Sequence, residues 1–213
     1  MAGVLVQLDG EEELIVDPGA GGAIDIDQLL TQAIIPRPIA FVSTLSADGV
    51  LNLAPFSFFT AVSANPPVIC FSPMIRRDGS KKDTLRNIEE TGEFVVNIVS
   101  EEFKEKMNLC APEYPADTDE FAISGLTAIA SDVVRPPRVA ESHVNMECRL
   151  VQVGQVSPLP RGGSLVLGEV VRFHVDDAVL TNGRIDPEKL HAIGRMGGPT
   201  YVRTTDRFVM PRP

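Results

Sequence analysis

The stretch of sequence that decides the fold is PRPIAFVSTLSADGVLNLAPFSFFTAV, residues 36–62. Residues 38–46 are apolar and β-branched, which predicts a strand, and an Asp-Gly pair at residues 48–49 follows as a strong hairpin signal. Residues 50–63 then predict the return strand of this hairpin. Pro55 interrupts that second strand, so we expect a sheet edge, a bulge or an irregular exit there. The stretch therefore indicates antiparallel β structure.

The rest of the chain continues these strand signals, with only short helices between them. Residues 144–156 and 164–175 alternate well enough to predict two long antiparallel strands. Shorter strands are predicted at residues 67–73 and 94–99, and short helices at residues 25–32, 84–91, 101–110 and 188–193. At least six strands joined by short turns predict an antiparallel β-barrel rather than an alternating βαβ fold.

Three regions carry weaker signals of regular structure. Residues 1–30 are acidic and Gly-rich, and we interpret them as an arm with one short strand at residues 5–8 followed by a loop. Residues 111–142 are rich in Pro, Asp and Ala, which predicts a long excursion from the sheet with little regular structure. The final stretch, residues 187–213, is loop-like apart from its short helix.

Composition and charge limit the class of protein. The chain has 213 residues, 44% of them hydrophobic, which is typical of a soluble globular protein with ample material for a core. It contains no 18-residue apolar run and no signal peptide at its N-terminus, so we expect no membrane contact. The three cysteines lie far apart, which favours free thiols, no metal site and a cytoplasmic location. A net charge of −10 makes nucleic acid a poor partner.

A local basic segment stands out in this acidic chain and suggests a phosphate ligand. Its cations are Arg76, Arg77, Lys81, Lys82 and Arg86. Asp83 and Thr84 predict the start of a helix, where free backbone N–H groups favour an anion. The alternative interpretation is a solvated charged loop. The P-loop pattern and the GxGxxG pattern of dinucleotide folds are both missing from the sequence.

A second candidate region covers residues 52–60, Asn-Leu-Ala-Pro-Phe-Ser-Phe-Phe-Thr. Small polar residues alternate there with apolar ones around a disturbed strand, which favours a mixed pocket for a flat heterocycle. The alternative is an ordinary core strand with polar residues at the surface.

Several blocks in a fixed order resemble one known family, the flavin reductase-like, FMN-binding split-barrel family. The blocks are residues 36–62, PPVICFSP at 66–73, KKDTLRNI at 81–88, GEFVVNIV at 92–99, RVAESHVNMECRL at 138–150 and GRMGG at 194–198. The resemblance covers roughly residues 30–205. It implies a domain over residues 31–205, preceded by the acidic arm (1–30) and followed by a short tail (206–213). The implied fold is an antiparallel Greek-key split β-barrel with a few short helices.

The resemblance also implies a cofactor, partners and site residues. It implies non-covalent FMN in a homodimer, a hydride that arrives at the flavin N5 from NADH or NADPH, and a flavin-accepting oxygenase or redox protein as a further partner. Residues 52–60 would line the flavin ring, with Ser43 and Thr44 nearby, and Lys82, Asp83 and Thr84 would hold the phosphate, with Ser72, Arg76 or Arg77 as further candidates. The cofactor-binding residues expected on this basis are Ser43, Thr44, Asn52, Leu53, Ala54, Ser57, Phe58, Phe59, Ser72, Arg77, Lys82, Asp83 and Thr84.

The resemblance leaves the activity itself open. The alternatives to an NAD(P)H-dependent flavin reductase are a flavoredoxin-like electron carrier and a heme- or pyridoxal-phosphate-binding barrel. None of His143, His174 and His191 is assigned to the family's nicotinamide-site histidine, so direct use of NAD(P)H stays open and no catalytic residue is named. Arg195 is either a ligand contact or part of a clamp on the chain's end. The sequence contains no recognisable catalytic triad or metal-binding motif, and flavin chemistry requires neither.

Overall fold

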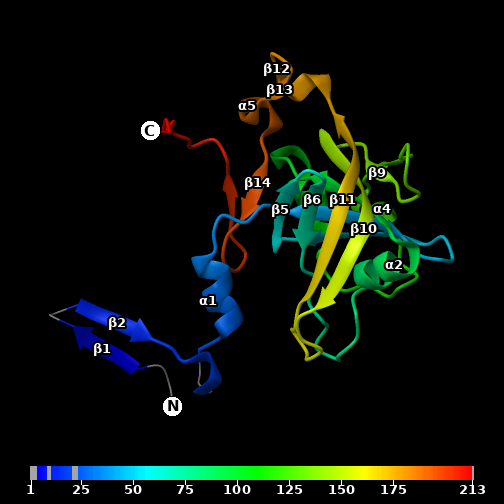
Figure 1. The fold of residues 1–213 in the computed structure, drawn as a ribbon. Coiled ribbons are helices and arrows are strands. Elements are labelled where there is room, and N and C mark those ends of the chain that lie inside the picture. The colour runs from blue at the N-terminus through cyan, green and yellow to red at the C-terminus, as the bar shows by residue number, and fades with distance from the viewer. Residues whose placement is uncertain (1–3, 9–10, 21–23, 213) are drawn as a thin grey trace.

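The computed structural model describes residues 4–8, 11–20 and 24–212 (Figure 1). The strands are β1 Val4–Leu8, β2 Glu11–Ile15, β3 Ala40–Leu45, β4 Leu51–Phe56, β5 Phe59–Ala64, β6 Pro67–Phe71, β7 Glu93–Ile98, β8 Ala128–Ile129, β9 Arg138–Val139, β10 Val144–Gln155, β11 Ser164–Val175, β12 Leu180–Thr181, β13 Arg184–Ile185, β14 Ile193–Arg195 and β15 Tyr201–Arg203. The helices are α1 Ile26–Ala33, α2 Asp83–Thr91, α3 Lys104–Leu109, α4 Glu120–Ser124 and α5 Pro187–Leu190, with 3-10 turns at Pro18–Ala20, Glu101–Phe103 and Asp177–Val179.

Seven strands form one antiparallel sheet in the order β4-β3-β7-β10-β11-β6-β5. The two long strands β10 and β11 run through its middle (Figure 1). The predicted hairpin joins β3 to β4, and Gly49 lies in its turn at φ +87, a left-handed conformation that glycine adopts without steric cost. The predicted antiparallel β fold with a few short helices is confirmed.

The predicted return strand at residues 50–63 is two strands rather than one. The chain breaks at Ser57 and Phe58, and β4 and β5 lie at opposite edges of the sheet. Pro55 therefore occupies an edge strand, the first of the three alternatives expected, because an edge position does not require its missing N–H. The break also leaves Ser57 and Phe58 outside the ladder.

Other predicted elements differ from the structure in their bounds. The predicted helix at residues 101–110 is a 3-10 turn followed by α3, and Ser100 makes no side-chain capping bond. The predicted helix near residue 188 ends at Leu190. Strands β2, β14 and β15 lie where loops were expected. Each is only three to five residues long, too short for a clear alternation, and pairs with its neighbour along the chain in a two-stranded hairpin. Asp25 caps α1 by accepting a bond from the Asp27 N–H.

Two hydrophobic clusters cover the two faces of β3. Ala40 and Val42 belong to one cluster, together with Leu85 and Ile88 of α2. Phe41 belongs to the other, which includes residues of α3 and α4. Because successive side chains of a strand point to opposite faces, β3 is buried on both. This buried strand and its hairpin hold the end of β4 in a fixed place.

The C-terminal hairpin β14–β15 returns to the start of the domain. The backbone N–H of Arg37 donates to the carbonyl of Arg195 at 2.9 Å, and the N–H of Arg195 donates to the carbonyl of Arg37 at 2.8 Å. The hairpin β1–β2 lies apart from the main sheet (Figure 1). Among the described residues, no helix is long and apolar enough to cross a membrane.

Candidate functional site

A pocket of about 590 Å³ lies between α1, the end of β4 and the hairpin β14–β15. This volume is in the usual range for small-molecule and cofactor sites. Its lining mixes aromatic and apolar side chains with charged ones. The apolar and aromatic residues include Ile39, Phe56, Phe58, Met74, Met107 and Tyr201, the cations are Arg37, Lys82 and Arg195, and the carboxylates are Asp25 and Asp27.

A smaller pocket of about 40 Å³ adjoins the first at the N-terminus of α2. The two share four lining residues, namely Pro55, Phe56, Lys82 and Ala111. They are therefore two parts of one continuous site. The smaller part begins at the helix end, where backbone N–H groups have no partners within the helix.

The smaller pocket contains an unsatisfied donor. Arg76 Nε is buried and has no hydrogen-bond partner among the described residues. The other side of the same guanidinium pairs with Asp83 at 2.5 Å. Glu113 Oε1 lies 3.9 Å from Arg76 Nε and 3.4 Å from Lys82 Nζ. A buried donor without a bond is costly, and an anion held between Arg76 and Lys82 would satisfy it.

The structure brings most of the predicted site residues to this site. Asn52, Ala54, Lys82, Asp83 and Thr84 line the smaller pocket, and Ser57, Phe58, Ser72 and Lys82 line the larger one. The other predicted residues, Ser43, Thr44, Leu53, Phe59 and Arg77, line neither pocket.

Ser43 and Thr44 are fully buried, and Thr44 supports the site. The Thr44 hydroxyl accepts bonds from the side-chain amides of Asn52 at 2.9 Å and Asn87 at 3.0 Å. The same Asn52 amide donates to the Thr84 hydroxyl at 2.9 Å. This chain of bonds ties β3, β4 and α2 together and sets the position of the helix N-terminus.

Three residues that the sequence analysis did not single out also form the site, namely Glu120, Arg37 and Tyr201. Glu120 of α4 lines the smaller pocket, and its Oε2 accepts the backbone N–H of Leu53 at 3.0 Å. Burial raises the pKa of the Glu120 carboxyl, and the Asp83 charge adds to this shift. Arg37 and Tyr201 line the larger pocket together with Arg195. No local motif indicates Glu120, because it lies on a short helix within the long excursion.

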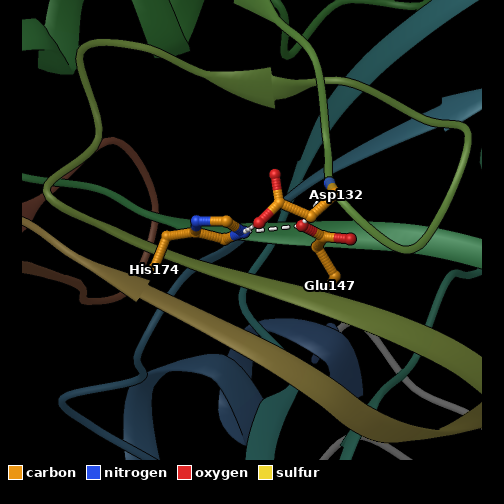
Figure 2. A group of neighbouring side chains, drawn as sticks. All are labelled: Asp132, Glu147 and His174. Carbon is orange, nitrogen blue, oxygen red and sulfur yellow. Dashed lines mark hydrogen bonds and ion pairs between the residues drawn. The ribbon is translucent and has the colours of Figure 1, made fainter.

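A separate cluster of Asp132, Glu147 and His174 lies on β10, β11 and the preceding loop (Figure 2). Glu147 is fully buried and accepts the backbone N–H groups of Asp132, Val133 and Val134 at 2.7–3.0 Å. His174 Nε2 lies 2.6 Å from its Oε1. These bonds fasten the loop at residues 132–134 to strands β10 and β11.

The remaining histidines, Cys70 and Cys148 lie outside both pockets, whereas Cys110 lines the smaller one. His143 bridges Asp176 at 3.0 Å and Glu102 at 3.1 Å. Burial raises the pKa of the Cys148 thiol, which is packed in the core, and raises that of Cys110 to about 11. These two thiols are therefore neutral at physiological pH.

Comparison with known proteins gives a family match over most of the chain. The family model described as "Flavin reductase like domain" matches residues 32–191. An uncharacterized protein of Aquifex aeolicus is 42% identical over 177 residues, which are 83% of this chain and 88% of that protein.

Solved structures agree with this match. Nitrilotriacetate monooxygenase component B from Bacillus cereus is 39% identical, with a TM-score of 0.87 over 93% of this chain and 98% of that one. A Shewanella frigidimarina protein with a split barrel domain is 26% identical, with a TM-score of 0.78 over 90% of this chain and 95% of that one. The predicted split barrel is thereby confirmed. The chain belongs to the flavin reductase-like family.

Proposed function

We propose that the protein is an FMN-dependent oxidoreductase that transfers hydride or electrons through a non-covalent flavin, with NADH or NADPH as the reductant. The observation that carries this proposal is the buried, unpartnered Arg76 Nε beside Lys82 at the N-terminus of α2. It fits a phosphate at the narrow end of a pocket whose wide end has room for a ring system. Family membership supports a flavin as the group that carries the phosphate.

Each part of the site has a task in this proposal. Lys82, Arg76 and the first backbone N–H groups of α2 would hold the phosphate. Ser57, Phe58 and Ser72 would bind and orient the ring, because they line the large pocket where the chain leaves β4 and where it leaves β6. Bound FMN would supply the capacity to accept a hydride and release electrons one or two at a time.

The phosphate assignment is tested by comparing FMN with riboflavin, which lacks the phosphate. Lys82→Ala is expected to weaken FMN about tenfold or more and to leave riboflavin unchanged, because a charge-assisted hydrogen bond contributes about 1.5–3 kcal/mol. Fluorescence quenching titrations measure both constants. Lys81→Ala is the matched control, since Lys81 lies next in the chain but pairs with Glu89 at 2.7 Å. Equal losses for FMN and riboflavin would contradict the assignment.

The activity is tested by mixing the FMN-loaded protein with NADH or NADPH in a stopped-flow instrument. Bleaching of the flavin absorbance by one nucleotide supports the reductase. If neither nucleotide bleaches the flavin, the protein is a flavoredoxin-like electron carrier. If the protein binds no flavin at all, the proposed function fails.

We further propose a cytoplasmic homodimer whose flavin domain spans residues 31–205 and which supplies an oxygenase or another redox protein. The oxygenase partner is supported by the similarity to a protein named as component B of a monooxygenase. The free state of Cys70, Cys110 and Cys148 agrees with a reducing compartment.

A further inference from the structure

The large pocket contains two arginines, Arg37 and Arg195, whose guanidinium groups donate hydrogen bonds only to neutral acceptors. Arg37 is 5% exposed, and its guanidinium donates to the Ser57 hydroxyl and to the carbonyls of Thr31, Ile34 and Met196. The Arg195 guanidinium donates to the Tyr201 hydroxyl and the Gly198 carbonyl. No carboxylate is among these acceptors.

The two guanidinium groups lie close enough to influence each other. Burial lowers the pKa of Arg37, and the positive charge of Arg195 lowers it further. Asp27 opposes this effect, but its carboxylate is bound to Arg161 at 2.8 Å, as Asp25 is at 3.5 Å. Asp25 and Asp27 also line the pocket, but its three cations outnumber these two carboxylates, inside a protein whose net charge is −10. Such a pair of guanidinium groups is unfavourable unless an anion joins it.

The pair is also rigidly held. Reciprocal backbone bonds of 2.9 and 2.8 Å join Arg37 to Arg195. The Arg195 guanidinium lies 4.5 Å from the centre of the Tyr201 ring, and that of Arg37 lies 6.0 Å from the Phe58 ring. Arg195 keeps N–H groups beyond those used for Tyr201 and Gly198, because a guanidinium has five. A planar donor of this kind, fixed against aromatic rings, matches a carboxylate on a flat molecule.

We propose that Arg37 and Arg195 form an anion subsite that binds the carboxylate of a small aromatic acid, the second ligand of the flavin site. This inference rests on the proposed function, since the second ligand would meet the flavin ring in this pocket. The subsite is separate from the phosphate end: Arg37 and Arg195 line only the large pocket, whereas Arg76 lines only the small one. The pyrophosphate of a nicotinamide dinucleotide is the other anion that the pair could take, and the test separates the two.

The test titrates the FMN-loaded protein with benzoate, with its neutral analogue benzamide and with ADP-ribose. Calorimetry and the shift of the flavin absorbance report binding. We expect benzoate to bind at least about tenfold more tightly than benzamide. Arg195→Gln should remove this preference and leave benzamide, FMN and riboflavin binding unchanged. Arg195→Lys should retain part of the preference, because it keeps the charge but not the planar fork.

Arg172→Gln is the matched control, since Arg172 is exposed and pairs with Asp132 at 2.8 Å away from the pocket. Thermal unfolding checks that the Arg195 variants are folded. Equal binding of benzoate and benzamide by the wild type would overturn the proposal. So would binding of ADP-ribose alone, with loss in Arg195→Gln, which would assign the pair to a dinucleotide.

Two results keep this proposal distinct from the proposed function. If Arg195→Gln weakens the binding of FMN but not of riboflavin, the arginine pair holds the flavin phosphate. The subsite proposal is then wrong, whereas the proposed flavin-dependent function stands. If the wild type binds no FMN, the proposed function fails first and the subsite fails with it.

Discussion

Lys82 and Lys81 are neighbours in the sequence but have different surroundings. Lys81 pairs with Glu89 on the exposed side of α2, whereas Lys82 lines both pockets. The only partner within ion-pair distance of Lys82 among the described residues is Glu113, at 3.4 Å. At the scale of single residues, the sequence predicted a phosphate near the basic segment, and the family resemblance favoured Lys82 as the residue that holds it. The reason that Lys82 is available, its weak partner on a distant loop, is visible only in the structure.

Glu113 lies near the two cations to which the proposed function assigns the phosphate. Its side chain is 56% exposed and lies between Lys82 and Arg76. Glu113→Gln removes a competing charge, so FMN should bind about two- to fivefold more tightly, in keeping with the about 0.2–1 kcal/mol of an exposed ion pair. Fluorescence quenching measures the gain.

Glu89→Gln is the control for this prediction, because Glu89 pairs with the lysine that faces away from the site. Riboflavin affinity should be the same in both variants. Weaker FMN binding in Glu113→Gln would show that Glu113 helps to shape the phosphate site instead of competing for it.

At the scale of elements, β10 holds the preceding loop through one buried side chain. Glu147 points from β10 into the protein, where it accepts three backbone N–H groups and contacts His174 (Figure 2). Burial raises the pKa of this carboxyl, but the bonds from Asp132, His174 and the following N–H groups outweigh burial, and the pKa is lowered overall. The ionised form is thus the one that the fold stabilises.

Glu147→Gln should lower the free energy of unfolding by about 2–3 kcal/mol at pH 7, since bonds to a charged acceptor are replaced by neutral ones. Because the folded pKa lies below the usual 4.5, this stabilisation is present above pH 4.5 and is lost as the pH falls through the folded value. Urea unfolding of wild type and variant at pH 7 and in acid measures the gap, which should close in acid. Asp132→Asn, at the exposed carboxylate of the same cluster, should change stability by less than about 1 kcal/mol. A gap that does not depend on pH would contradict this account.

The break between β4 and β5 shows a limit of sequence patterns at the element scale. Residues 50–63 continue the strand pattern across Ser57 and Phe58, so a single strand was predicted. In the structure β4 pairs with β3, and β5 pairs with β6 at the other edge of the sheet. The crossing from one edge to the other exposes Ser57 and Phe58 to the large pocket. Pairing partners, rather than local preference, decide where a strand stops.

At the scale of the whole molecule, several apolar side chains remain exposed on a single chain. The most exposed are Val156, Leu159, Phe208, Val209 and Met210. Soluble monomers seldom leave such groups uncovered when they are adjacent, as they are at residues 208–210. In the homodimer proposed above, a second copy of the chain would cover these side chains.

We therefore expect light scattering coupled to size exclusion to give twice the chain mass of 23.0 kDa. The measurement is made with and without FMN, since a site completed by both chains would tighten the dimer when loaded. A mass of one chain at micromolar concentration would contradict the dimer and leave the flavin assignment standing.

The sequence by itself determined most of the elements and the family. Strand alternation and the turn at Gly49 depend on residues a few positions apart, and the order of several such blocks identified the family. Only the tertiary structure decided the site. Arg37 meets Arg195, and Lys82 meets Glu113, because the sheet and the C-terminal hairpin bring distant segments together. Charge pairing and burial act through space, so a pattern of neighbours along the chain does not reveal which cations are left for a ligand.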